Sequence, residues 1–220
     1  MGQSKVMKIA LIGYGKMGKL IEKVALSHGH SIEGKITPSS PDWTLLEPVD
    51  VVIDFSSAQA VIDTVKQCAY YNKNLVIGTT GWHDLLPQVK QIAQAAKIGI
   101  VYSPNFSIGV QSFFKLIAYA AKLMESRDEY DRAILEVHHK EKKDAPSGTA
   151  LVMQKLLQAE ITSSRVGSVT GEHHLLFDSP FDSITLSHKA KSREGFALGA
   201  ITAAEWLLGK EGCYTFEDIC

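Results

Sequence analysis

The sequence lacks the features that mark secreted and membrane-spanning proteins. Its three cysteines, Cys68, Cys213 and Cys220, are odd in number and far apart. This pattern favours reduced thiols in a cytoplasmic protein over a disulfide framework. The Met1–Lys8 segment has no long apolar run and no small-residue cleavage pattern, so we expect no secretory signal. No apolar run reaches about 18 residues, so we also expect no membrane-spanning helix.

A charge excess of either sign is also missing, because the net charge is −1 over 220 residues. A chain with so little net charge has no global basic field to attract nucleic acid or an anionic membrane, so we expect neither as a partner. Any anion must then be bound by a local cluster of basic groups. The length suits one large domain or two small ones.

The N-terminal half alternates short apolar runs with segments whose apolar residues recur at helical spacing. The runs at 7–13, 31–36, 49–56, 74–81 and 98–105 predict five strands with helices between them. Buried strands separated by helices of about 12 residues indicate βαβ units and a parallel sheet covered on both faces. The sequence therefore predicts a Rossmann-like, doubly wound α/β domain.

Ligands of such sheets bind at the carboxyl ends of the strands, so the segments that follow the strands are candidate binding segments. These segments are rich in Gly, Ser, Thr or Asn: Gly13–Gly18, Lys35–Thr37, Phe55–Ser57, Gly78–Gly81 and Ser103–Phe106. The first reads GYGKMG and matches G-x-G-x-x-G between a strand and a helix, which predicts a pyrophosphate at the helix N-terminus. An ordinary glycine-rich turn without a cofactor is the alternative.

The end of the second strand predicts which nicotinamide cofactor is preferred. An acidic residue about 20 positions after the glycine loop normally contacts the adenosine ribose. Glu33 has that spacing but lies inside the strand, whereas the strand end carries Lys35 and Thr37. A cation there favours a 2′-phosphate and therefore NADPH, with NADH as the second cofactor. A solvated lysine with no ligand is the alternative.

The second half has a different pattern. Helices are expected at 110–124, 149–159 and 196–208, and strands at 130–139, 168–178 and 182–190. Short strands with few helices between them indicate a mixed or antiparallel sheet with one exposed face, hence a smaller α+β domain. The change of pattern at Phe106–Val110 is the expected domain boundary.

The segment EVHHKEKKDAPSGTAL, residues 136–151, collects basic and titratable groups before a predicted helix. Ser147 is a favoured N-cap, and we expect the N–H groups of Gly148, Thr149 and Ala150 to be free and aided by the helix dipole. Gly148 leaves room for an anion, and the lysines at 140, 142 and 143 add positive charge. The segment predicts a receptor for a small, doubly charged anion.

The adjacent histidines of this segment, His138 and His139, titrate near neutral pH and could deliver a proton. Neighbours on a strand face opposite ways, so both reach one pocket only if the strand ends at His138. A solvated charged turn is one alternative for the segment. A metal site with the histidines at 173, 174 and 188 is another, but lysines among the ligands would repel a cation, and we predict no metal.

The sequence resembles the dihydrodipicolinate reductase family through seven segments in the family's order, from Ile9 to about Gly199. They are GYGKMG, VVIDFSS, GTTGW, SPNFSIGV, EVHHKEKKDAPSGTA, GEHHLLF and SHKAKSREGFALGA. The resemblance implies NAD(P)H-dependent reduction of dihydrodipicolinate (4-hydroxy-tetrahydrodipicolinate), a small dicarboxylate, to tetrahydrodipicolinate in lysine and diaminopimelate biosynthesis. It also implies a Rossmann-like domain over 1–107 completed by 194–220, and a substrate domain over 108–193 that forms a homotetramer through its sheet.

The same resemblance implies roles for individual residues. His138 matches the acid/base histidine and Lys142 the proton-donating lysine, while substrate contacts are implied for His139, Gly148, Thr149 and Arg193. Cofactor contacts are implied for Gly13, Tyr14, Gly15, Lys16, Met17, Gly78, Thr79, Thr80, Ser103, Pro104, Asn105 and Phe106, and Lys35 joins them from the strand-end argument. The glycine loop is one residue shorter than the usual family form.

Two rival functions remain at this point. One is a different two-domain dehydrogenase, for example one that acts on an amino-acid semialdehyde, and the DAPSGTA segment argues against it. The other is a dinucleotide-binding sensor that has lost catalysis, and the presence of His138, Lys142 and Gly148–Thr149 argues against that.

Overall fold

The computed structural model describes residues 6–220, and the chain divides into two compact units. Unit 1 joins the chain up to Ser107 with Glu194–Cys220, and unit 2 is Ile108–Arg193. The Met1–Lys8 segment, where no secretory signal is expected, lies mostly outside the described residues. Among the described residues, no helix has both the length and the apolar character that crossing a membrane requires.

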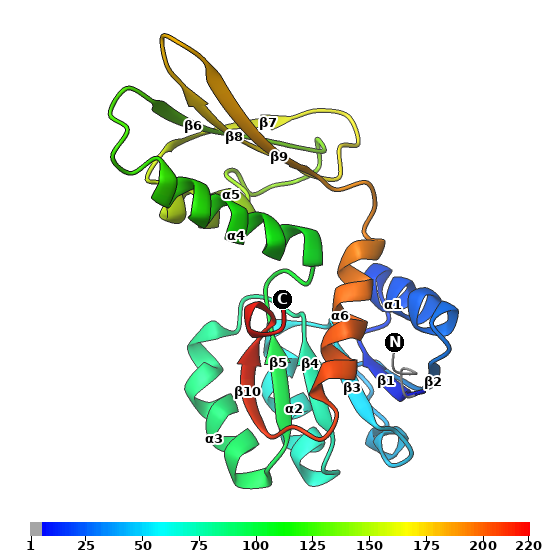
Figure 1. The fold of residues 1–220 in the computed structure, drawn as a ribbon. Helices are drawn as coiled ribbons and strands as arrows, with labels where there is room; N and C mark the ends of the chain where they lie inside the picture. Colours follow the sequence, from blue (N-terminus) through cyan, green and yellow to red (C-terminus); the bar gives the residue numbers. More distant parts are fainter. Residues whose placement is uncertain (1–5) are drawn as a thin grey trace. The chain divides into compact units, whose positions relative to one another are not determined.

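Unit 1 is built on a six-stranded sheet with the order β10-β5-β4-β3-β1-β2, in which every neighbouring pair is parallel (Figure 1). Its strands are β1 (Lys8–Ile12), β2 (Ser31–Ile36), β3 (Val51–Asp54), β4 (Asn74–Ile77), β5 (Gly99–Tyr102) and β10 (Gly212–Thr215). Its helices are α1 (Lys16–Ser27), α2 (Val61–Tyr70), α3 (Leu86–Ala96) and α6 (Glu194–Leu207). The predicted doubly wound class is confirmed, and β10 is a strand that the sequence did not predict.

Alternate residues of β1 point to opposite faces of this sheet and so define two cores. Ile9 and Leu11 pack with buried side chains of α1 and α6. Ala10 and Ile12 pack on the other face with buried side chains of α2 and α3. Because both faces are covered by helices, the strands must be apolar throughout, which explains the continuous apolar runs of the sequence.

Unit 2 is a four-stranded mixed sheet with the order β7-β6-β8-β9. Its strands are β6 (Asp131–His138), β7 (Glu160–Arg165), β8 (Glu172–Asp178) and β9 (Ser183–Lys189), and its helices are α4 (Ile108–Leu123) and α5 (Gly148–Leu157). The β6–β7 pair is parallel, whereas β6–β8 and β8–β9 are antiparallel. The mixed or antiparallel sheet predicted for this half is a mixed one, and β7 is a strand that the sequence did not predict.

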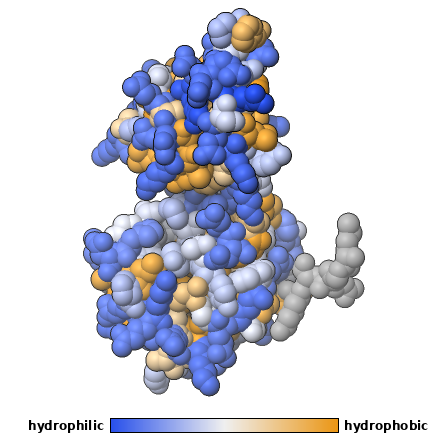
Figure 2. Space-filling view, turned by 60° about the vertical axis from the view of Figure 1, so that its left-hand side comes forward, coloured by the Kyte–Doolittle hydropathy of each residue, from blue (hydrophilic) through white to orange (hydrophobic). Residues whose placement is uncertain are grey.

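The helices of unit 2 cover one face of its sheet, and apolar residues of both layers form the core (Figure 1). Figure 2 shows hydrophobic side chains gathered over these helices, where Leu116 and Leu123 of α4 and Leu151 and Leu156 of α5 are exposed. The other face of the sheet has no covering layer within the unit. Polar side chains on the helix side of the sheet are therefore enclosed between the two layers.

Candidate active site

The glycine loop after β1 fits a dinucleotide pyrophosphate. Gly13 has φ +83°, and a Cβ there would lie 2.5 Å from the Phe55 carbonyl oxygen, so only glycine suits this position. Among residues 6–220, no atom would lie within 4 Å of a Cβ at Gly15, and no side chain caps the N-terminus of α1 there. The space and the N–H groups at this helix start match the requirements of a phosphate.

The other predicted cofactor segments lie at the same sheet edge, because they all follow the carboxyl ends of parallel strands. Asp54, at the end of β3, accepts hydrogen bonds from the Ser56 amide (2.8 Å) and the Thr79 hydroxyl (3.1 Å). These bonds tie the Phe55–Ser57 segment to Gly78–Thr80, which follows β4. Burial raises the pKa of Asp54 to about 6, since a low dielectric disfavours the carboxylate.

The Ser103–Phe106 segment after β5 is held by its own side chains and by aromatic packing. The Ser103 hydroxyl donates to the Asn105 carbonyl oxygen (2.8 Å) and accepts from the Asn105 amide (3.1 Å). The Phe106 ring lies 6.1 Å from that of Phe55 and 4.9 Å from that of Phe216. The backbone of this segment is therefore fixed beside the β3 and β4 ends.

A cavity of about 500 Å³ opens in unit 1 between the segments that follow β2 and β3. Its lining includes Pro38 and Ser39 after β2, Trp43, and Ser57 after β3. A doubly wound sheet places the adenosine half of a dinucleotide in this region, so the cavity suits that half.

Lys35, near the end of β2, contacts Glu22 and Tyr14, and the sequence did not predict that these three residues lie together. Its ammonium lies 2.7 Å from a carboxylate oxygen of Glu22 on α1 and 4.6 Å from the centre of the Tyr14 ring. The Tyr14 hydroxyl donates to the same Glu22 carboxylate. Hydrogen bonds from Lys35 and Tyr14 lower the pKa of Glu22. Glu33 lies in mid-strand, as expected, and accepts from the Ser31 hydroxyl.

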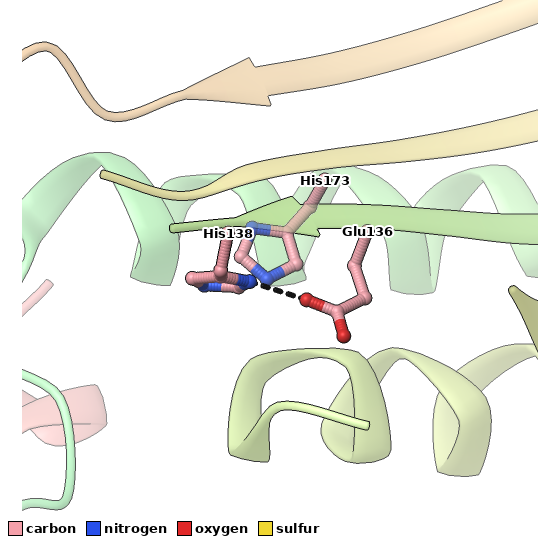
Figure 3. A group of neighbouring side chains, drawn as sticks. All are labelled: Glu136, His138 and His173. Atoms are coloured by element: carbon pink, nitrogen blue, oxygen red, sulfur yellow. Dashed lines mark hydrogen bonds and ion pairs between the residues drawn. The ribbon is translucent and has the colours of Figure 1, made fainter. Parts of the chain in front are cut away.

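In unit 2, β6 ends at His138, so the condition for both neighbouring histidines to reach one pocket is met. Glu136, His138 and His173 are buried and point toward one another from β6 and β8 (Figure 3). His138 Nδ1 is hydrogen-bonded to Glu136. The rings of His138 and His173 meet edge to face, with centres 5.1 Å apart.

Arg165, at the end of β7, neutralises the buried Glu136 carboxylate through a 2.8 Å ion pair. Burial alone would raise the pKa of Glu136, but hydrogen bonds from Arg165, Ser163 and His138 outweigh it and lower that pKa. Burial lowers the pKa of His138, and the neighbouring Glu136 does not fully offset this. Burial thus favours the neutral form of His138. Because a carboxylate only accepts hydrogen bonds, Nδ1 carries the proton donated to Glu136, and Nε2 of the neutral ring is an acceptor.

The N-terminus of α5 is tied to the same cluster. The Ser147 hydroxyl oxygen accepts from the Ala150 amide (3.2 Å) and lies 3.1 Å from His173 Nε2. Ser147 is thus the N-cap predicted, but the expectation that the Ala150 N–H is free is wrong, because the cap uses it. A Cβ at Gly148 would meet nothing within 4 Å, so the approach to this helix end is open. Burial lowers the pKa of His173 to about 4.

Among the described residues, Glu136, His138 and His173 are the one group whose ligand atoms, all within 4.8 Å of one another, could hold a metal ion. The charges argue against that use. Both carboxylate oxygens of Glu136 already have partners, and one partner is the Arg165 guanidinium. A divalent cation would have to displace the Arg165 guanidinium or lie next to its positive charge. The cluster is therefore better suited to orienting the His138 ring than to binding a metal ion.

Lys142 lies in the loop between β6 and α5, and both oxygens of the Asp144 carboxylate accept from its ammonium at 2.7 Å. Arg165 also donates to the Asp144 carbonyl oxygen (2.6 Å), so one guanidinium joins this loop to Glu136. Lys142 is close enough for its charge to lower the pKa of His138.

The two other predicted substrate contacts differ in exposure. His139, which follows β6, is half-buried, whereas Arg193 lies in the exposed segment between β9 and α6.

Sequence reasoning missed four residues of these arrangements: Glu22, Glu136, Arg165 and His173 as a member of the cluster. Glu136 and His138 are two apart on a strand, a spacing that places them on one face and could have paired them. Arg165 and Glu22 gave no such signal, because their partners come from other elements.

Comparisons with known proteins identify relatives over the whole chain. The family model described as "Dihydrodipicolinate reductase, N-terminus" matches residues 7–106, and the C-terminal model of that family matches 109–220. A 4-hydroxy-tetrahydrodipicolinate reductase of Thermosipho africanus is 38% identical, with 97% of each chain covered. One from Christiangramia forsetii is 36% identical, also with 97% of each chain covered.

The solved structures agree on the fold. A dipicolinate-bound dihydrodipicolinate reductase from Paenisporosarcina sp. TG-14 has a TM-score of 0.75 at 23% identity, covering 98% of this chain and 100% of that one. A diaminopimelate (DAP) dehydrogenase from C. glutamicum has a TM-score of 0.59 at 15% identity, covering 98% and 94%. The resemblance found in the sequence motifs is confirmed.

Proposed function

Because the chain belongs to the dihydrodipicolinate reductase family, it is an oxidoreductase of lysine and diaminopimelate biosynthesis, and we propose how its residues divide the work. Its reaction is the NAD(P)H-dependent reduction of 4-hydroxy-tetrahydrodipicolinate to tetrahydrodipicolinate. The observation that carries the proposal is a set of contacts in unit 2. Glu136 and Arg165 join His138 to the Lys142 loop, and Ser147 joins the N-terminus of α5 to His173, whose ring packs against that of His138. These contacts hold a base, a cation and an anion-binding helix end together in unit 2.

The N-terminus of α5 binds one carboxylate of the substrate. Ser147 caps the helix, and the open approach at Gly148 lets an anion come close to the backbone N–H groups of Gly148 and Thr149. The helix dipole adds partial positive charge at this end. His139 and Arg193 are the further substrate contacts that we propose. Fixing the ring by its carboxylate is catalysis by positioning.

His138 and Lys142 handle the proton of the reaction. Loss of water from the 4-hydroxy substrate gives the conjugated ring, and hydride addition to that ring leaves an electron-rich enamine carbon that must gain a proton. The Lys142 ammonium is the group with a proton to give, and Asp144 orients it. Neutral His138 offers Nε2 as an acceptor, because Glu136 holds the proton on Nδ1. Glu136 and Arg165 thus act through His138 rather than on the substrate.

The cofactor lies in unit 1 and is held by the proposed contacts of the Gly13–Met17, Gly78–Thr80 and Ser103–Phe106 segments. When bound, the reduced nicotinamide supplies the hydride. Lys35 at the end of β2 supports NADPH as the preferred form, because a 2′-phosphate needs a cationic partner. NADH is the second cofactor.

We also propose a homotetramer formed through the outer face of the unit 2 sheet. Leu135 and Leu176 lie on that face and are 43% and 37% exposed in a single chain. A second copy is the natural cover for such a face, because a symmetric contact pairs a surface with itself. A cytoplasmic location fits the cysteine pattern.

An assay of NADPH absorbance tests the function directly. Dihydrodipicolinate is made in situ from pyruvate and aspartate semialdehyde, and we expect NADPH loss only when both precursors have been combined. Loss with aspartate semialdehyde alone would identify a different two-domain dehydrogenase, one that reduces the semialdehyde. Tight NADPH binding with no loss on any substrate would identify a sensor.

The variant Lys142→Ala tests proton delivery. We expect kcat to fall by at least about 100-fold, because general acid catalysis contributes that much, while the NADPH dissociation constant stays within about twofold. Lys155→Ala is the matched control, because Lys155 is an exposed lysine of α5 in the same unit. Near wild-type turnover of Lys142→Ala would exclude the lysine as the proton donor.

A further inference from the structure

We propose that Glu22 limits the chain's preference for NADPH, by holding Lys35 and by supplying the carboxylate that the end of β2 lacks. The inference rests on the proposed function, because it concerns which nicotinamide nucleotide that reductase uses. The cofactor site would then present a cation and an anion side by side, one suited to each cofactor.

Three elements bring the pair to the adenosine side of the cofactor site. Lys35 is next to the last residue of β2, which lies beside β1 with Leu11 opposite Lys35. Tyr14 belongs to the glycine loop after β1, and Glu22 lies on the helix that this loop begins. The cavity lined by Pro38, three residues after Lys35, opens next along the chain. The ribose carrying the 2′ group is bound at this strand end in doubly wound folds.

The two cofactors differ only in the 2′ group, and each suits one member of the pair. The 2′-phosphate of NADPH is an anion and pairs with an ammonium, whereas the 2′-hydroxyl of NADH donates a hydrogen bond to a carboxylate. Glu22 is 20% and Lys35 42% exposed at the side chain, so a ligand can reach both. The carboxylate is therefore placed to do what an acid at the end of β2 does elsewhere.

Glu22 also opposes the phosphate. Its carboxylate lies 2.7 Å from the Lys35 ammonium, so a phosphate that pairs with Lys35 must break that ion pair or approach the carboxylate closely. Hydrogen bonds from Lys35 and Tyr14 lower the pKa of Glu22, so the carboxylate keeps its charge throughout the neutral range. The repulsion is therefore always present, and NADPH gains less from Lys35 than it would from an unpaired lysine.

Glu22→Gln keeps the shape of the side chain and removes its charge. We expect the ratio of kcat/KM for NADPH to kcat/KM for NADH to rise about tenfold, because Lys35 is released and the like charge is gone. Lys35→Gln should act in the opposite direction, with kcat/KM for NADPH about tenfold lower and that for NADH changed by less than about threefold. The two variants thus move the preference in opposite directions from a shared site.

Glu194→Gln is the charge-matched control, because Glu194 pairs at 2.7 Å with Lys23, the neighbour of Glu22 on α1. We expect the cofactor ratio of this variant to stay within about twofold of wild type. The inference would be overturned if the ratio of kcat/KM for NADPH to kcat/KM for NADH were also unchanged in Glu22→Gln. It would equally be overturned if this ratio rose as much in Glu194→Gln as in Glu22→Gln. Dissociation constants of both cofactors, measured by nicotinamide fluorescence without the dicarboxylate, must show the same pattern. Because that readout needs no turnover, it separates failure of this inference from failure of the proposed reaction.

Discussion

Asp54 in unit 1 and His173 in unit 2 are buried titratable residues whose pKa values move in opposite directions for the same reason. Burial disfavours the charged form of each, which raises the pKa of Asp54 to about 6 and lowers that of His173 to about 4. Between pH 4 and 6, native Asp54 binds a proton that the unfolded chain releases. Native His173 rejects one that the unfolded chain binds. Their effects on the pH dependence of stability therefore oppose each other in one window.

The variant Asp54→Asn separates the two effects. Since the native pKa of Asp54 is raised above its unfolded value of 3.8, wild-type stability from this group falls as pH rises through the window. A shift of about 2 units corresponds to about 3 kcal/mol. We expect the free energy of unfolding of Asp54→Asn minus that of wild type to rise by about 2 kcal/mol from pH 4 to pH 7, because part of the effect lies below pH 4.

Tryptophan fluorescence during urea unfolding is the suitable measurement, because Trp43, Trp82 and Trp206 all lie in unit 1 with Asp54. His173 lies in unit 2 and is unchanged in both proteins, so it does not enter the difference. A difference that stays flat across the window would show that Asp54 is ionised in the native state at all these pH values.

Single residues also show how far the sequence could predict the site. Lys35 was predicted because its place at a strand end follows from the apolar pattern alone. Glu22 and Arg165 were not predicted, because each gains its role from a partner on another element. Glu22 pairs with Lys35. Arg165 donates to Glu136 and to the Asp144 carbonyl oxygen. Periodicity gives the face of an element on which a residue lies, but not which elements become neighbours.

At the scale of elements, the two strands that the sequence missed, β7 and β10, both lie at the edge of a sheet. β7 reads EITSSR, which has a single large apolar residue, and it pairs only with β6 at the edge of its sheet. β10 has four residues and lies at the edge beside β5. Edge strands need fewer apolar side chains, so hydrophobic patterning detects them poorly. The buried strands and the long helices were predictable because they must be apolar on the faces that they bury.

Helix α6 carries an element-scale prediction, because it closely approaches the segment after β5. A Cβ on Gly199 would lie 1.7 Å from the Phe106 carbonyl oxygen, so Gly199→Ala must push the helix or that segment away. We expect a loss of about 3 kcal/mol in the free energy of unfolding and weaker NAD(P)H binding, since Phe106 ends the proposed cofactor segment. Urea unfolding and cofactor titration measure the two effects.

Gly195→Ala is the control on the same helix, because a Cβ there would meet nothing within 4 Å. Alanine should stabilise that position by up to about 1 kcal/mol through its higher helix propensity. If both variants changed stability by the same amount, the close approach at Gly199 would not be the cause.

At the scale of the whole molecule, unit 2 has helices on one face of its sheet and none on the other. The cluster of Glu136, His138 and His173 lies on the helix side, so the outer face is left for a different use. Alternation along the strands places Leu135 of β6 and Leu176 of β8 on that outer face. Apolar residues exposed at the middle of a sheet are costly in a monomer and useful in an assembly of identical copies.

Leu176→Glu therefore tests the proposed tetramer. A carboxylate at the centre of a packed sheet face would be buried without a partner, so we expect a smaller assembly by analytical ultracentrifugation, with the circular dichroism spectrum unchanged. Leu26→Glu, at an exposed leucine of α1 in unit 1, is the matched control and should keep the wild-type assembly. If Leu176→Glu sedimented like wild type, the outer sheet face would not be the contact. Assembly and chemistry would then use opposite faces of this unit, because the strands that carry the histidines on one side would join the copies on the other.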